Sequence, residues 1–113
     1  MDIEITPLDD RCNVVRLNGR LDSPGVDRIE TRFIAAVVAA GRDAVLDLSG
    51  VSFLASMGIR MLITNARAMG NKGHKLAIFG AVDPVLAVLE SVAIDQIIPV
   101  AADQQQAVAA LNA

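Results

Sequence analysis

The chain has 113 residues, 53% of them hydrophobic, and a formal net charge of −3 at pH 7. This length allows one hydrophobic core and is too short for two, so we expect a single domain over residues 1–113. The acidic balance argues against nucleic acid as the main partner, and no apolar run reaches the ~20 residues that a membrane helix needs.

The first two strands are expected to form a hairpin. Ile3 and Ile5 alternate with polar residues, as do Val15 and Leu17, and this period of two is typical of half-buried strands. Cys12 begins the second strand and is the only cysteine, so an internal disulfide is excluded. With no basic or apolar leader at the N-terminus, the single cysteine indicates a cytoplasmic protein.

A helix is expected to begin at Asp22-Ser23-Pro24. Asp22 or Ser23 can cap it, and Pro24 suits the first helical position. An apolar stripe at helical spacing follows, and Gly41 stops the helix. The stripe comprises Val26, Ile29, Phe33, Ala36, Val37 and Ala40.

The chain is organised around the segment from residue 45 to residue 62. Val45–Leu48 is predicted to be a buried central strand that ends in a turn at Ser49-Gly50, with Asp47 at the strand end bonding loop N–H groups. A long helix follows, and we expect Ser56 to be its N-cap. Because N–H groups at a helix start can hold an anion, Ser56 presents a hydroxyl where a phosphate would be tolerated.

This long helix carries two apolar faces. One should pack on the sheet and comprises Ile59, Leu62, Ile63, Ala66 and Met69. The opposite face, expected to see water, comprises Met57, Met61, Thr64 and Ala68, with Arg60 and Arg67 beside it. Methionine is common on adaptable binding surfaces, so we interpret this stripe as a partner surface, although scattered surface apolarity is the alternative. The stripe also permits a homodimer.

Three more elements complete the chain after a strand at Lys75–Phe79. They are a helix from Asp83-Pro84, a short strand or extended segment at residues 97–100, and a helix Gln104–Leu111 capped by Asp103. Alternating strands and helices predict one α/β domain with a mixed sheet of four to five strands and about four helices. The sequence shows no paired carboxylates, metal-ligand cluster, nucleophile–base pair or phosphate loop, so we expect no enzyme, cofactor or metal.

The order of the motifs resembles the STAS family, the sulfate-transporter and anti-sigma-factor-antagonist domain. Asp47-Leu48-Ser49, a short apolar loop and Ala55-Ser56-Met57-Gly58 resemble the family's Asp-Leu-Ser and Asp-Ser-x-Gly pattern. Gly19-Arg20-Leu21-Asp22 resembles its second strand and following loop, and the end of the chain resembles its last part. Where the family usually has Asp before the serine, this chain has Ala55.

The resemblance implies an anti-sigma factor antagonist that binds an anti-sigma factor serine kinase and is released by phosphorylation at Ser56, regulating sigma-factor-dependent transcription. A parallel second strand would place Asp22 on the same sheet edge as Ser56. The docking surface would then comprise Asp22, Ser56, Met57, Arg60 and Met61. Two alternatives stay open and suit Ala55: an accessory STAS subunit of a lipid-transport ABC transporter, and an interaction module that is not phosphorylated.

Overall fold

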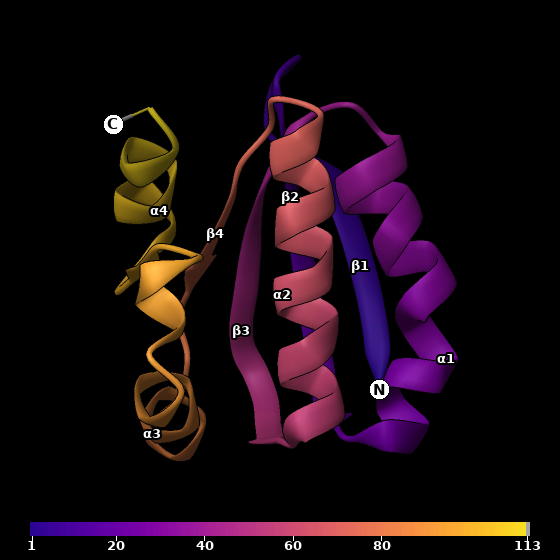
Figure 1. The fold of residues 1–113 in the computed structure, drawn as a ribbon, viewed down its shortest axis with the longest axis vertical. Helices are drawn as coiled ribbons and strands as arrows, with labels where there is room; N and C mark the ends of the chain where they lie inside the picture. Colours follow the sequence, from indigo (N-terminus) through magenta and orange to yellow (C-terminus); the bar gives the residue numbers. More distant parts are fainter. Residues whose placement is uncertain (113) are drawn as a thin grey trace.

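The strands pair in the order β1-β2-β3-β4-β5, so each strand lies beside its neighbour in sequence. The computed structural model, which describes residues 1–112, shows β1 antiparallel to β2 and all other pairs parallel (Figure 1). The mixed sheet predicted above is therefore confirmed. The strands are β1 Asp2–Pro7, β2 Cys12–Leu21, β3 Asp43–Leu54, β4 Leu76–Phe79 and β5 Val100–Ala101.

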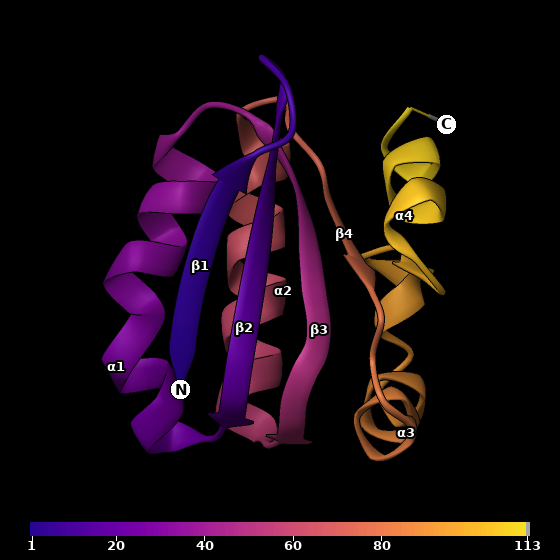
Figure 2. The same cartoon turned by 180° about the vertical axis from the view of Figure 1, so that it is seen from behind.

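Helices cover both faces of this sheet unequally. α1 and α2 lie side by side over one face, whereas α4 contacts β3, β4 and β5 from the other (Figures 1 and 2). In Figure 2, no helix in the described part of the chain crosses β1 and β2 on that reverse face. The helical elements are α1 Ser23–Ile34, the π-helical η1 Ala35–Ala39, α2 Ser56–Asn71, α3 Asp83–Ser91, the 3₁₀ turn η2 Ile94–Gln96 and α4 Gln104–Leu111.

The core divides at the sheet because successive strand residues point to opposite faces. Leu46 and Ile78 belong to the large cluster under α1, α2 and α3, whereas Val45 and Ala77 belong to a smaller cluster under α4. Cys12 is buried in the smaller cluster, and this burial, with nearby carboxylates, raises the pKa of its thiol to about 11. The thiol is therefore protonated at neutral pH, as expected for a structural cysteine.

β3 is longer than the sequence predicted. It continues through Ser49 and Gly50, where the pairing with β2 shifts register between Arg16 and Asn18. A Cβ on Gly50 would displace the Asn18 amide and would lie 3.0 Å from the Leu17 carbonyl oxygen, so glycine fits this irregularity best. The predicted turn was therefore wrong, and Asp47 lies within the strand, although its carboxylate does accept the backbone N–H of Ser49 at 2.9 Å.

The predicted caps of α1 and α4 are confirmed, whereas the last strand begins later than expected. Asp22 caps α1 by accepting the N–H of Gly25 at 3.0 Å, and Asp103 caps α4 by accepting the N–H of Gln106 at 2.9 Å. The strand expected at residues 97–100 is displaced to Val100–Ala101, because η2 and its hydrogen bonds occupy the preceding residues.

Candidate functional site

The ends of β2 and β3 lie next to each other at one edge of the sheet. Leu21 and Leu54, the last residues of these strands, are paired, and the N–H of Ala55 donates to the Leu21 carbonyl oxygen at 3.0 Å. Each strand then turns directly into a helix, at Asp22 for α1 and at Ala55 for α2. Asp22 and Ser56 therefore stand at the same sheet edge, as predicted.

Gly58 allows the start of α2 to approach this edge closely. A Cβ at position 58 would lie 2.7 Å from the Leu21 carbonyl oxygen and 2.8 Å from Cδ1 of Leu54. Carbon atoms do not approach so closely, so any larger residue would push the helix away. The glycine of Ala55-Ser56-Met57-Gly58 thus fixes the distance between the helix start and β2.

Ser56 is the first helical residue, not the N-cap. Ala55 occupies the cap position with extended backbone (φ −110°, ψ 175°) and offers no side-chain acceptor, so the predicted capping role of Ser56 was wrong. The Ser56 side chain is exposed, and its hydroxyl makes no hydrogen bond within residues 1–112. The helix start therefore presents a free hydroxyl beside N–H groups that no side chain caps.

Asp22 combines a structural bond with a surface charge. One carboxylate oxygen accepts the Gly25 N–H, and the other accepts from Nε of Arg20 at 3.2 Å. The Gly25 hydrogen bond, with a smaller contribution from Arg20, lowers the pKa of Asp22 below its usual value. The side chain remains 26% exposed, so a negative charge reaches solvent beside the start of α2.

Arg20 and Phe53 join the site, and sequence reasoning missed both. They are paired across β2 and β3, and the Arg20 guanidinium lies 4.2 Å from the centre of the Phe53 ring. Phe53 is 42% exposed, so the pair forms a cation–π contact at the surface next to Asp22. Arg20 and Phe53 meet because of the register in which β2 and β3 pair. The pairing is irregular near Gly50, so this register could not be predicted by counting residues along the two strands.

The expected methionine stripe is only partly exposed. Met57 is 38% exposed and Arg60 lies at the surface, but Met61 is only 2% exposed, so the expectation that Met61 faces water was wrong. The reason is that α2 packs against α1 as well as against the sheet, which rotates its buried face. That face comprises Gly58, Met61, Leu62, Asn65 and Met69.

The family model of the STAS domain matches residues 5–107. The chain belongs to the STAS family. A comparison of this STAS domain with curated proteins finds no match.

Solved structures with the same fold come from several bacteria. A Thermotoga maritima crystal structure has a TM-score of 0.87 at 15% identity, with 98% of this chain and 95% of that chain covered. An anti-sigma factor antagonist from Mycobacterium paratuberculosis has a TM-score of 0.83 at 24% identity, with 99% and 94% covered. The phosphorylated form of SpoIIAA, a Bacillus cell fate determinant, has a TM-score of 0.71 at 15% identity, with 96% and 98% covered.

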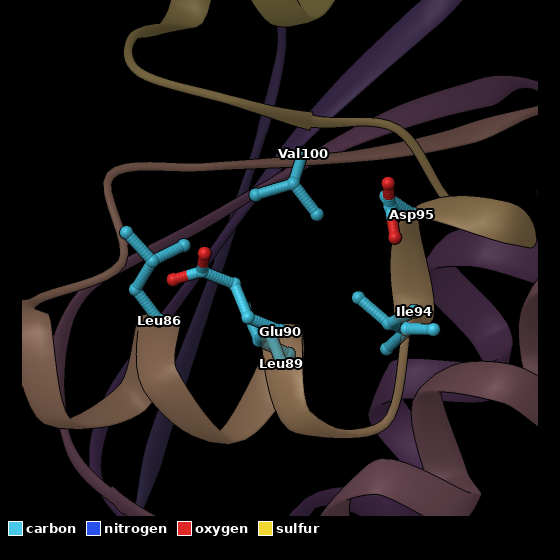
Figure 3. A pocket seen from close by; sticks show the side chains of 7 residues that line it. Leu86, Leu89, Glu90, Ile94, Asp95 and Val100 are labelled. Carbon is cyan, nitrogen blue, oxygen red and sulfur yellow. The ribbon is translucent and has the colours of Figure 1, made fainter.

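One hollow of this STAS domain lies away from Ser56. It measures about 430 Å³ and is formed by α3, η2 and β5, with the carboxylates of Glu90 and Asp95 near the apolar side chains of Leu86 and Val100 (Figure 3). A second hollow of about 350 Å³ runs between α1 and α2 and is lined in part by Met57 and Arg60. The groove between α1 and α2 is therefore continuous with the predicted docking surface at Met57 and Arg60.

Within residues 1–112, no group of three or more His, Cys, Asp or Glu side chains is placed to hold a metal ion. None of the helices in this range combines the length and the apolar character needed to cross a membrane.

Proposed function

We propose that this STAS domain is an anti-sigma factor antagonist, which binds an anti-sigma factor serine kinase and is released when that kinase phosphorylates Ser56. The observation that carries the proposal is the free, exposed Ser56 hydroxyl at the start of α2, beside the Asp22 carboxylate. Support also comes from the solved structures of the same fold, which include an anti-sigma factor antagonist and a phosphorylated SpoIIAA.

A phosphate on Ser56 would act through charge and leave the fold unchanged. It adds about −1.5 to −2 charges at the surface, and the helix start stabilises such a charge by roughly 0.3–1 kcal/mol. Ser56 makes no structural hydrogen bond within the described residues, so nothing in the core depends on its hydroxyl. A partner docked over Ser56 would have to bury the phosphate, and an unpaired buried charge costs several kcal/mol.

Ala55 is compatible with this switch. A protein kinase supplies its own base and Mg²⁺, so the substrate serine needs accessibility more than a neighbouring carboxylate. Ala55 also leaves the first-turn N–H groups of α2 without a side-chain acceptor, so they stay available to a phosphate. The proposed docking surface comprises Asp22, Ser56, Met57 and Arg60, together with Arg20 and Phe53. Met61 contributes from the floor of the groove only.

In this role the protein acts by binding the kinase and catalyses no reaction itself. It does so in the cytoplasm, where sigma factors act. The domain over residues 1–113 frees a sigma factor when it holds the kinase. Phosphorylation returns the kinase to that sigma factor.

Phosphate mapping tests the proposal directly. The purified chain is incubated with its cognate anti-sigma factor kinase and ATP, and modified sites are identified by mass spectrometry. We expect phosphate on Ser56 and none in Ser56→Ala, whereas Ser52→Ala, which removes another exposed hydroxyl of the same region, should still be modified. No modification together with no binding of the kinase would reject the proposal.

A second candidate function is the accessory STAS subunit of a lipid-transport ABC transporter. Ala55, in place of the family's Asp, favours it because that role needs no phosphorylation. Co-purification with a transport ATPase in place of a sigma regulator would favour this second candidate.

A further inference from the structure

The groove between α1 and α2 exposes large apolar side chains that no other part of the described chain covers. Ile34 of α1 is 41% exposed and Met57 of α2 is 38% exposed, and both line the groove. The floor is closed by Met61, which is buried. Figure 1 shows α1 and α2 side by side, and the groove is lined from Glu30 to Val38 on one wall and from Met57 to Ala68 on the other.

Two opposite charges flank this groove without pairing. Glu30 lies in the third turn of α1 and Arg60 in the second turn of α2, and both side chains are exposed. Neither forms an ion pair or a side-chain hydrogen bond with any residue in the described part of the chain. Their charges are therefore free to pair with another molecule.

The two walls of the groove also match each other in pattern. Glu30, Ile34 and Val38 follow one another at four-residue spacing on the α1 side, and Arg60, Thr64 and Ala68 do so on the α2 side. Each wall thus runs from a charge to smaller or apolar side chains in the same direction, because α1 and α2 both start at the same sheet edge.

We infer that this groove is the interface of a homodimer, in which α1 of one protomer packs against α2 of its partner. A two-fold axis along the groove makes every contact twice, so Glu30 faces the partner's Arg60 while Arg60 faces the partner's Glu30. Ile34 and Val38 then cover the apolar side chains of the opposite α2. A groove that carries one charge of each sign on opposite walls is complementary to itself, which a patch of one sign is not.

This dimer would hold the protein in a form that cannot receive its partner. Met57 and Arg60 belong both to the groove and to the docking surface suggested above, so self-association and kinase binding exclude each other. This last consequence rests on the proposed function, whereas the dimer itself does not.

Sedimentation of the chain alone tests the interface. Because the apolar contact is small, we expect a weak dimer with a dissociation constant of roughly 10–500 µM. Glu30→Arg, or Arg60→Glu, turns both symmetric pairs into like-charge contacts and should weaken the dimer by about tenfold or more. The double variant Glu30→Arg/Arg60→Glu restores both pairs and should recover the wild-type constant.

A mixture of the two single variants gives the sharpest result. One variant presents two arginines and the other two glutamates, so each should associate more weakly alone than the two do together as a heterodimer. Far-UV circular dichroism and thermal melting check that both variants fold, which is expected because Glu30 and Arg60 are exposed.

The inference is overturned if the wild-type chain stays monomeric up to about 1 mM at low salt. It is also overturned if the double variant fails to recover association. If the single variants instead lose kinase binding while the wild-type chain never self-associates, the groove belongs to the kinase. Since no kinase or ATP enters the sedimentation experiment, failure of the proposed phosphorylation would leave the dimer result unaffected.

Discussion

The backbone N–H of Ala55 donates a 3.0 Å hydrogen bond to the carbonyl oxygen of Leu21, and this bond ties the start of α2 to the end of β2. It places the exposed serine that follows Ala55 beside the capping carboxylate that follows Leu21. A surface that a partner can recognise thus arises from two strand ends whose residues are far apart in sequence.

The closeness of this junction predicts a large penalty for a side chain at position 58. Gly58→Ala places a Cβ 2.7 Å from the Leu21 carbonyl oxygen, so we expect destabilisation of about 1–3 kcal/mol in urea unfolding. Gly70→Ala is the matched control in the same helix, since a Cβ there meets nothing within 4 Å. It should stabilise the protein by roughly 0.5–1 kcal/mol. Equal effects of the two substitutions would contradict the packing role of Gly58.

The Asp47 carboxyl is expected to make the folded protein less stable at low pH. Burial raises the pKa of this carboxyl, but hydrogen bonds from Ser49 and the 3.0 Å ion pair with Arg16 outweigh it and leave the pKa below its usual value. A group with a lower pKa in the folded chain binds fewer protons there, so its stabilisation is complete above about pH 4 and is lost as the pH falls.

Urea unfolding of Asp47→Asn between pH 2 and pH 6 checks this. The variant cannot titrate at this position, so its stability should fall less steeply with acid than that of the wild-type protein. Asp47→Ala also leaves the Ser49 N–H without its acceptor and should cost about 1–3 kcal/mol at pH 7. Parallel acid curves for Asp47→Asn and the wild type would show that another carboxylate dominates.

Two substitutions of Asp22 can distinguish its role as the cap of α1 from its proposed role in docking. Asp22→Asn keeps an oxygen that can accept the Gly25 N–H but removes the surface charge, so thermal stability should change little. If the carboxylate takes part in docking, calorimetry should show weaker binding of the kinase. Asp22→Ala removes both functions and should lower the melting temperature as well. A stable Asp22→Asn variant with unchanged affinity would restrict this residue to its cap.

Ser56→Asp should mimic the modified state without disturbing the fold. A negative charge in the first turn of α2 is expected to stabilise the helix by roughly 0.3–1 kcal/mol, measured by urea unfolding. The same variant should lose kinase binding in calorimetry, because its carboxylate would be buried under the partner. Ser52→Asp, in the neighbouring end of β3, should retain binding. Loss of stability in Ser56→Asp would mean that the hydroxyl has a structural role.

The parts of the site that sequence reasoning placed correctly are those that depend on near neighbours. Asp22 was expected at a helix start and on the same sheet edge as Ser56, and the structure confirms both positions. The N-cap assignment failed by one residue, because Ala55, not Ser56, takes the extended backbone that precedes the helix. A serine among small residues carries no sequence signal that fixes this boundary to the residue.

By itself the sequence determined the order of strands and helices, the helix starts at Asp22 and Asp103, and membership of the STAS family. These follow from periodicity and from bonds between residues a few positions apart. Only the tertiary structure decided that Met61 is buried against α1 and that Arg20 meets Phe53. Helix periodicity tells which residues share a face, but which face is covered depends on neighbours that only folding brings together.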